Sequence, residues 1–208
     1  MVRAWAADVS PLYREERYRY YYEKLPEFRR RKADALRIPE MKAQSAGAWI
    51  LWERIRAEYG LRESAVFNLS HSGSYVMCAA LLDGKAARVG CDLEQVGQLR
   101  EKVAERFFCP EEYETIMGAG TQEERTERFY RYWVLKESFM KATGKGMALA
   151  ADSFCIRLGE PPVLVRQPEE FPEQYYYMEY RQKGMPYKMA VCSSDGEIDG
   201  ELYMEFKL

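Results

Sequence analysis

The stretch Val89-Gly90-Cys91-Asp92-Leu93-Glu94, near the middle of this 208-residue chain, alternates apolar and acidic residues. As a β-strand it would direct Asp92 and Glu94 to one face of a sheet, while Cys91 and Leu93 would face the opposite side. Two carboxylates would then share one side of the strand.

A second stretch, Trp133 to Lys141, has the pattern of a helix. Trp133, Glu137 and Lys141 fall at positions i, i+4 and i+8, which places a carboxylate and an ammonium group along one helical face. If that face meets the strand, three carboxylates and one lysine converge.

Three carboxylates held close together repel one another unless a cation lies between them or their pKa values rise. Mg²⁺ prefers oxygen ligands and commonly combines one or two carboxylates with substrate phosphates. We therefore expect Asp92, Glu94 and Glu137 to bind Mg²⁺ together with a phosphate-bearing substrate. An isolated Asp-x-Glu pair is usually two solvated surface charges, so the neighbouring segments decide between these interpretations.

The neighbouring segment reads as an antiparallel meander. Residues 67–73 form a strand and a polar turn, residues 74–82 a second strand, and residues 87–94 a third. This topology would bring His71, the single histidine of the chain, beside the acidic strand end. A lone histidine is usually structural or simply exposed, but its position among small hydroxyl residues and a glycine favours a contact with phosphate.

These motifs occur in a recognisable order. The run Phe67–Gly73, the stretch Val89–Glu94 and Trp133-x-x-Lys136-Glu137-Ser138-x-x-Lys141, followed by Gly144-Lys145-Gly146, together resemble the 4′-phosphopantetheinyl transferases, and more closely the monomeric branch that activates surfactin-type peptide synthetases. The match covers residues 67–158, with a looser likeness over 26–47 and 187–192. Such enzymes depend on Mg²⁺ and transfer the phosphopantetheine arm of coenzyme A to a serine of a carrier protein, releasing adenosine 3′,5′-bisphosphate.

The resemblance implies roles for individual residues. Glu137, His71 and Lys141 are expected to be catalytic, with Glu137 as the base that accepts the proton of the carrier serine. The residues expected to bind the coenzyme are Arg31, Gln44, Ser70, His71, Lys136 and Lys141. Among these, Lys136 ranks lower because it lies one residue off the face shared by Glu137 and Lys141. For the basic run that contains Arg31, a solvated helix face is the alternative interpretation.

The chain departs from the family pattern between Tyr59 and Phe67. Family members usually carry a further strand and a Gly-Lys-Pro element there, which supports the adenine and phosphate end of coenzyme A. Its absence leaves three alternatives open: weak coenzyme affinity, replacement by a nearby arginine such as Arg62, or loss of activity.

Composition narrows the class of protein. Apolar and charged fractions are those of an ordinary globular protein, and the net charge of −2 argues against general nucleic-acid binding. No run of eighteen apolar residues and no signal peptide is apparent, so we expect a cytoplasmic protein that does not enter a membrane. The five scattered cysteines lack a C-x-x-C spacing, and buried reduced thiols are expected.

The expected fold is α+β, with two similar halves related by a pseudo-twofold arrangement. Each half would be a small antiparallel sheet with helices, and the active site would lie between them. The N-terminal half would span residues 1–95 and the C-terminal half 96–208. A faint repeat supports this division, since Tyr187 to Cys192 echoes Tyr75 to Ala80.

The expected partners are coenzyme A and an acidic, helical carrier domain that docks near residues 117–124, and the protein is expected to be a monomer. Two other classes of function remain as alternatives. One is a relative that binds coenzyme A or the carrier without transfer, which the missing segment favours. The other is a nucleic-acid-binding module built on residues 29–32, which the interleaved acidic residues disfavour.

Overall fold

The computed structural model describes all 208 residues and confirms the α+β class. The α-helices are α1 (Glu15–Tyr22), α2 (Glu27–Asp34), α3 (Pro39–Glu58), α4 (Glu101–Phe107), α5 (Pro110–Met117) and α6 (Gln122–Ala142). Three short 3₁₀ turns are η1 (Ser10–Tyr13), η2 (Gly146–Ala148) and η3 (Ala151–Ser153). The strands are β1 (Val2–Asp8), β2 (Phe67–Ser72), β3 (Tyr75–Leu81), β4 (Val89–Gln95), β5 (Cys155–Arg157), β6 (Val163–Arg166), β7 (Tyr176–Tyr180), β8 (Tyr187–Ser193) and β9 (Ile198–Tyr203).

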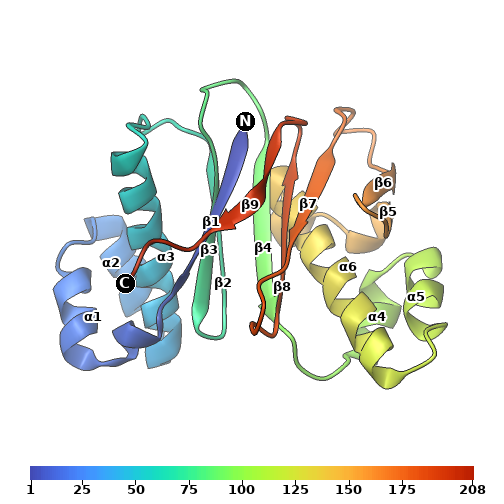
Figure 1. Cartoon of the computed structure of the whole chain (residues 1–208), viewed down its shortest axis with the longest axis horizontal. Helices are drawn as coiled ribbons and strands as arrows, with labels where there is room; N and C mark the ends of the chain where they lie inside the picture. Colours follow the sequence, from blue (N-terminus) through green and yellow to red (C-terminus); the bar gives the residue numbers. More distant parts are fainter.

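Two sheets stand side by side at the centre, and helices cover their outer faces (Figure 1). The first sheet has the strand order β2-β3-β1-β9, and α1 to α3 lie on its outer side. The second has the order β4-β8-β7, and α4 to α6 lie on its outer side. A separate two-stranded ribbon pairs β5 with β6. The succession of helices, sheet, sheet and helices gives the two-halved architecture that the sequence predicts.

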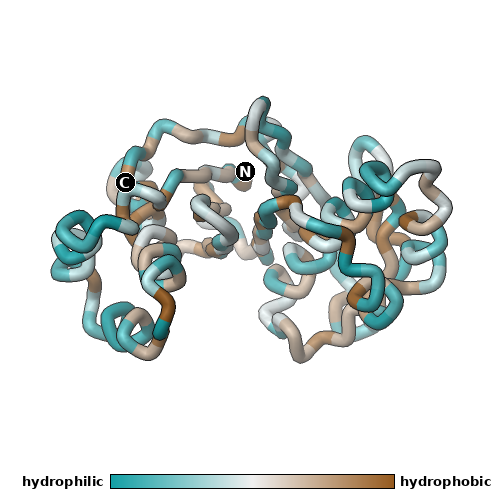
Figure 2. Tube along the Cα trace, turned by 90° about the horizontal axis from the view of Figure 1, so that it is seen from below, coloured by the Kyte–Doolittle hydropathy of each residue, from teal (hydrophilic) through white to brown (hydrophobic).

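Alternation along the strands builds three hydrophobic cores. In β3, Val76 and Cys78 face the helices of the first half, whereas Met77 and Ala79 face the second sheet. In β4, Cys91 packs with this central core between the sheets. A third core joins α6 to the second sheet. Figure 2 shows many hydrophilic residues along the outer helices and loops.

The approach of α6 to β4 depends on Gly90. A Cβ atom at this position would collide with the backbone of Ser138 and Ala142, which belong to α6 or its last turn. Only glycine lets the helix lie this close to the strand. Since Asp92 and Glu94 lie on the same face of β4 as Gly90, the helix covers the acidic face of the strand.

The predicted meander is wrong in its third strand. β2 and β3 form the expected hairpin, but β4 leaves the first sheet and pairs with β8. In return, β9 enters the first sheet and runs parallel to β1, which is an exception to the expected antiparallel pairing. Strand pairing therefore crosses the proposed boundary at residue 95 in both directions.

The internal repeat occupies equivalent places in the two sheets. β3 and β8, which carry the similar sequences, are each an inner strand of their sheet. The rings of Tyr75 and Tyr187, the first residues of the two strands, meet edge to face with centroids 5.2 Å apart.

The helical pattern of residues 133–141 falls inside the long helix α6. Thr121 caps this helix by accepting the Glu124 N–H. None of the helices combines the length and the apolar character that a membrane-spanning segment needs.

Candidate active site

Side chains of β2 complete the free edge of β4. Three backbone N–H groups of β4, those of Cys91, Leu93 and Gln95, donate to side chains of β2. The acceptors are Asn68 Oδ1 at 3.1 Å, Ser70 Oγ at 3.4 Å and Ser72 Oγ at 3.2 Å. The N–H donors of β4 and the acceptor side chains of β2 both recur at every second residue. They therefore hold the two strands in register, although no backbone–backbone hydrogen bonds join them.

The same serines hold the carboxylates of β4. Ser70 Oγ donates to Asp92 Oδ1 at 2.7 Å, and Ser72 Oγ donates to Glu94 Oε2 at 2.8 Å. Each hydroxyl thus accepts one backbone N–H and donates to the neighbouring carboxylate, which uses its donor and acceptor capacity together. The two acidic side chains are fixed at the seam between the two sheets.

Lys141 reaches this seam from α6. Its Nζ donates to Asp92 Oδ1 at 2.7 Å, to Ser70 Oγ at 3.0 Å and to the carbonyl oxygen of Cys91 at 3.2 Å. Burial alone would lower the pKa of Lys141, but the charge of Asp92 outweighs it and the pKa of Lys141 is raised. Lys141 therefore remains an ammonium ion at neutral pH and pairs with Asp92.

Glu137 lies one helical turn before Lys141 and completes the carboxylate cluster, which we define as Asp92, Glu94 and Glu137. Burial, followed by the charge of Asp92, raises the pKa of Glu137, and the charge of Glu94 acts in the same direction. Burial and Asp92 likewise raise the pKa of Glu94. The predicted convergence of strand and helix is thus present in the structure.

The donor set of the carboxylate cluster fits Mg²⁺. Asp92 Oδ2 is a buried oxygen with no hydrogen-bond partner, an arrangement that costs free energy unless a cation or donor approaches it. Three carboxylates supply the hard oxygen ligands that Mg²⁺ prefers. As the side chains stand, their ligand atoms do not all lie within 4.8 Å of one another.

His71 lies on the exposed end of β2, on the opposite face of the strand from Ser70. The surrounding protein partly desolvates its exposed ring and so lowers its pKa, and the positive charges of Lys141 and then Lys32 lower it further. His71 is therefore a neutral imidazole at neutral pH, which can donate a hydrogen bond to phosphate but brings no positive charge of its own. Lys141 and Lys32, whose charges act on His71, supply the positive charge at this place.

Gln44 holds the turn that presents this strand end. Its Nε2 donates to the carbonyl oxygen of Gly73 at 2.7 Å, and the hydroxyl of Tyr13 donates to the same oxygen at 3.0 Å. Gly73 has a φ of 53°, a backbone conformation that favours glycine. Gln44 thus positions the β2–β3 turn near the serines.

The structure does not bring Arg31 to the carboxylate cluster. Its guanidinium, which is 78% exposed, pairs with Glu27 on the same face of α2. The next residue, Lys32, is the α2 cation whose charge acts on His71. The coenzyme contact of Arg31 stays a prediction.

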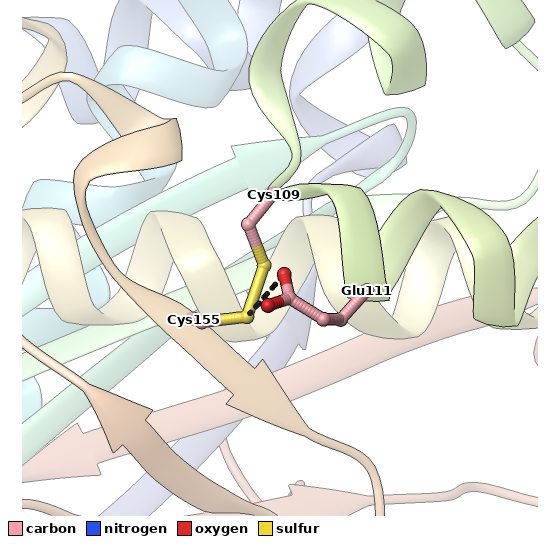
Figure 3. Close-up of side chains that lie close together, drawn as sticks. All are labelled: Cys109, Glu111 and Cys155. Carbon is pink, nitrogen blue, oxygen red and sulfur yellow. Dashed lines mark hydrogen bonds between the residues drawn. A yellow bond between two sulfur atoms is a disulfide. The ribbon is translucent and has the colours of Figure 1, made fainter.

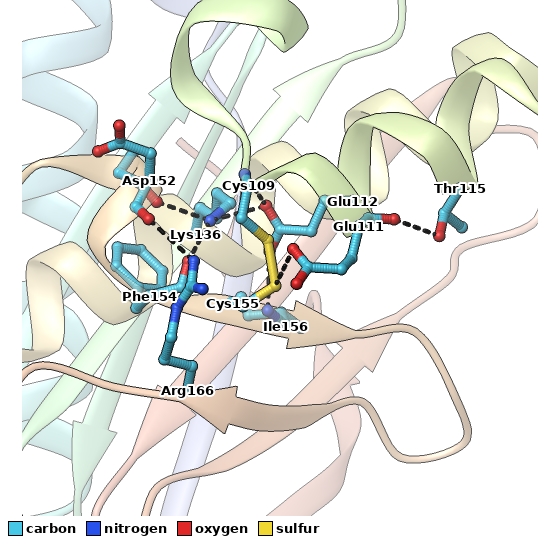
Figure 4. Close-up of a disulfide and its surroundings, with 11 residues drawn as sticks. Cys109, Glu111, Glu112, Thr115, Lys136, Asp152, Phe154, Cys155, Ile156 and Arg166 are labelled. Carbon is cyan, nitrogen blue, oxygen red and sulfur yellow. Dashed lines mark hydrogen bonds and ion pairs between the residues drawn. A yellow bond between two sulfur atoms is a disulfide. The ribbon is translucent and has the colours of Figure 1, made fainter.

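Lys136 lies away from the site, contrary to the predicted phosphate contact. Its side chain is only 2% exposed and pairs with Glu112 at 2.8 Å. The ammonium also donates to the carbonyl oxygens of Ala151 and Phe154, at 2.7 and 2.9 Å (Figure 4). One residue step along α6 turns this side chain to the interior, whereas Glu137 faces β4. Glu112 has a structural role, since its carboxylate also accepts the N–H groups of Cys109 and Ile156.

The prediction of reduced thiols is wrong for two cysteines. Cys109 and Cys155 form a disulfide that joins the start of α5 to β5 (Figure 3). The carboxylate of Glu111 lies 3.7 Å from Cys155 Sγ, but bonded sulfurs are not thiolate ligands, so this trio is no metal site in the oxidised protein. The other three cysteines, Cys78, Cys91 and Cys192, are buried and free, as predicted.

Three contributors to the site escaped the sequence prediction: Asn68, Ser72 and Lys32. The pattern Asn68-x-Ser70-x-Ser72 carries a signal, because polar side chains at every second position of a strand mark one face. The groups that these three side chains bind lie on β4, and the predicted meander gave the position of β4 wrongly. The expected absence of a strand between α3 and β2 is confirmed, since residues 59–66 contain no helix or strand.

Comparisons with known proteins show which family the chain belongs to. A sequence model of the 4′-phosphopantetheinyl transferase superfamily matches residues 88–192. The chain is 36% identical over 141 residues to 4′-phosphopantetheinyl transferase Sfp of Bacillus subtilis (strain 168), covering 67% of this chain and 60% of that protein. It is 40% identical over 107 residues to 4′-phosphopantetheinyl transferase HetI of Nostoc sp., covering 50% of this chain and 41% of that protein. It thus spans less than two thirds of the length of these relatives.

Among solved structures, the holo-[acyl-carrier-protein] synthase of Thermotoga maritima is similar over 51% of this chain and 61% of that chain, with 23% identity and a TM-score of 0.43.

Proposed function

Since the chain belongs to the 4′-phosphopantetheinyl transferase superfamily, we propose that it transfers the 4′-phosphopantetheine arm of coenzyme A to a serine of an acyl or peptidyl carrier protein, with Mg²⁺ as the metal. The observation that carries the proposal is the carboxylate cluster, in which Asp92 keeps a buried oxygen without a partner. Ligands for a divalent ion and an adjacent lysine suit a pyrophosphate substrate.

The chain's own residues would position and neutralise the reacting groups. Asp92, Glu94 and Glu137 would hold the metal, and Lys141 and Lys32 would face phosphate oxygens with positive charge. When bound, Mg²⁺ would neutralise charge on the pyrophosphate. His71, neutral at pH 7, would donate a hydrogen bond to the leaving bisphosphate.

Proton transfer would fall to Glu137. The serine oxygen of the carrier forms a bond to the β-phosphorus of coenzyme A while the bond from that phosphorus to the bisphosphate breaks. The serine proton passes to the Glu137 carboxylate, directly or through water. Its raised pKa brings this base nearer to neutral pH, where general-base help is typically worth about 10²- to 10⁴-fold in rate.

The experiment that tests the proposal measures the intact mass of apo carrier proteins after incubation with the protein, coenzyme A and Mg²⁺. We expect the mass to rise by one phosphopantetheinyl group, and a chelator to abolish the rise. Glu137→Gln should abolish it as well. Glu169→Gln, an exposed glutamate in the loop between β6 and β7, is the control and should keep activity.

A second candidate function is binding without transfer, which the short connection over residues 59–66 favours. Unchanged carrier mass on several unrelated carriers, together with measurable coenzyme A binding, would support that candidate. The carrier would dock near residues 117–124 in either case, and a monomer would suffice, because every residue of the carboxylate cluster comes from one chain.

A further inference from the structure

The disulfide between Cys109 and Cys155 has a carboxylate beside it. Cys109 directly precedes α5, Glu111 lies in the first turn of that helix, and Cys155 begins β5. One ligand atom from each of these residues lies within 4.8 Å of the other two. Figure 3 shows the Glu111 carboxylate pointing towards the sulfur atoms. We call Cys109, Glu111 and Cys155 the cysteine trio.

The position of the Glu111 carboxylate is not explained by the oxidised protein. Its Oε2 atom lies 3.7 Å from Cys155 Sγ, but a disulfide sulfur has no proton to donate. The carboxylate forms no ion pair, and as an exposed group it is free to extend into water. A reason for its place next to two sulfur atoms must therefore come from another state of the cysteines.

Reduction changes the chemistry of the cysteine trio. Disulfides are rare in reducing compartments, where a dithiol reductant converts the bond to two thiols and is itself oxidised to a disulfide. Two thiolates and one carboxylate are ligands that Zn²⁺ accepts in proteins. Mg²⁺ prefers oxygen ligands and does not compete for sulfur. The cysteine trio and the carboxylate cluster would thus select different metals.

Distances in the cysteine trio suit a tetrahedral zinc ion. With Zn–S bonds of about 2.3 Å and a Zn–O bond of about 2.1 Å, sulfur and oxygen ligands lie about 3.6 Å apart, and two sulfurs about 3.8 Å apart. The Glu111 oxygen already lies 3.7 Å from Cys155 Sγ. The Cα atoms of Cys109 and Cys155 are 6.0 Å apart, so side-chain rotation alone can separate the sulfurs to the zinc-bound distance.

Positive groups around the cysteine trio favour thiolates. Arg166 is the β6 partner of Cys155, and its guanidinium donates to the carbonyl oxygen of Asp152 at 3.2 Å without forming an ion pair (Figure 4). The N-terminus of α5 adds partial positive charge at Cys109. Both sulfurs are buried, whereas Glu111 is exposed. Water can therefore reach a fourth coordination position from the side of Glu111.

We propose that the cysteine trio binds one Zn²⁺ ion when Cys109 and Cys155 are reduced, and that disulfide formation releases the ion. On binding, Zn²⁺ replaces the two thiol protons. On release, an oxidant of the disulfide class, such as oxidised glutathione, takes two electrons and two protons and becomes two thiols. Zinc would then join α5 to β5 where the disulfide is absent. The inference does not depend on the transfer reaction, since no residue of the carboxylate cluster takes part.

Zinc titration of the full chain in its reduced and oxidised forms tests the inference. The protein is reduced with a phosphine, desalted without oxygen and titrated in excess Mg²⁺, which competes for the carboxylate cluster. We expect the reduced protein to bind one more Zn²⁺ per chain than the oxidised protein. Co²⁺, used in place of Zn²⁺, should give a thiolate-to-metal charge-transfer band in the near ultraviolet with the reduced protein only. Zinc should raise the Tm of the reduced protein, because the folded state builds the site.

Variants of the cysteine trio assign the ligands. Cys109→Ser and Cys155→Ser should each abolish the additional zinc site and the Co²⁺ band. Glu111→Gln should weaken zinc binding by the reduced protein at least about tenfold, since loss of even a group that only orients a ligand costs that much. Glu114→Gln, an exposed glutamate further along α5, is the matched control and should leave zinc affinity unchanged.

Equal zinc binding by the reduced and oxidised proteins would overturn the inference, and so would a Co²⁺ complex of the reduced protein without the thiolate band. Unchanged zinc affinity in Glu111→Gln would overturn the three-residue site. Zinc that binds without raising the Tm of the reduced protein would also overturn it, because such binding does not distinguish the folded chain from the unfolded one.

Discussion

Ser70 and Asp92 share a hydrogen bond of 2.7 Å that joins the two sheets at the candidate active site. The hydroxyl of Ser70 also accepts from Lys141 at 3.0 Å, so a single β2 side chain fixes one carboxylate of β4 and one ammonium group of α6. Because Ser70 is almost fully buried, this contact is a permanent part of the structure and does not depend on a substrate.

We predict that Ser70→Ala lowers the affinity for Mg²⁺ about 10- to 100-fold, the usual effect of removing a group that orients a metal ligand. The measurement is the Mg²⁺ concentration that gives half-maximal transfer activity. Ser72→Ala, which frees Glu94, should act in the same direction. Ser64→Ala, in the exposed connection before β2, is the control. An unchanged Mg²⁺ requirement in both cluster variants would contradict the orienting role.

We predict that Glu137→Gln makes the folded protein more stable at pH 7 while it abolishes transfer. Burial and Asp92 raise the pKa of Glu137 above its ordinary value of 4.5, so the folded state holds this proton more tightly than the unfolded chain does. The ionised group therefore costs folding stability above pH 4.5, and the cost is complete once the pH exceeds the raised pKa. Urea denaturation at pH 7 should show the gain, which should shrink as the pH falls towards 4.5.

The same variant separates electrostatic repulsion from metal binding. Mg²⁺ should raise the Tm of the unmodified protein, because a ligand that binds only the folded state stabilises it by mass action. It should raise the Tm of Glu137→Gln much less. A Tm that responds equally to Mg²⁺ in both proteins would place the metal elsewhere.

The sequence predicted the parts of the fold that depend on local patterns. The helical pattern of residues 133–141 falls inside α6, and the hairpin of β2 and β3 follows from the alternation of residues 67–82. The partner of β4 did not follow, because local sequence cannot tell a strand that continues a hairpin from one that crosses to β8. Pairing between residues a hundred positions apart is fixed only by the complete core.

The same limit applies to the side chains of the candidate site, because local sequence does not show which distant segments they contact. Helical spacing placed Glu137 and Lys141 on one face correctly. It could not show that Lys136, the residue directly before Glu137, would pair with Glu112 from another helix. Equally, cysteine spacing gave no reason to join Cys109 to Cys155, since the two are brought together only by the packing of α5 on β5.

We predict that Lys136→Met lowers the free energy of unfolding by about 3–5 kcal/mol, because it leaves the buried carboxylate of Glu112 without its partner. The double variant Lys136→Met with Glu112→Leu should recover part of this loss. Chemical denaturation of the single and double variants gives the coupling between the two residues. Lys102→Met, an exposed lysine of α4, is the control. If Lys136→Met keeps its stability and loses only coenzyme affinity, the result would support the predicted contact of Lys136 with phosphate and contradict its structural role.

The disulfide predicts how many cysteines react with an alkylating agent. Of the five cysteines, Cys78, Cys91 and Cys192 are free, so alkylation of the denatured, unreduced protein should add three labels, and five after reduction. Since the bond closes a loop between residues 46 positions apart, Cys155→Ser should lower the free energy of unfolding by about 2–4 kcal/mol. Transfer activity should survive, because the disulfide contacts no residue of the carboxylate cluster. Five labels without reduction, on protein purified without reductant, would show that the two thiols remain apart in solution.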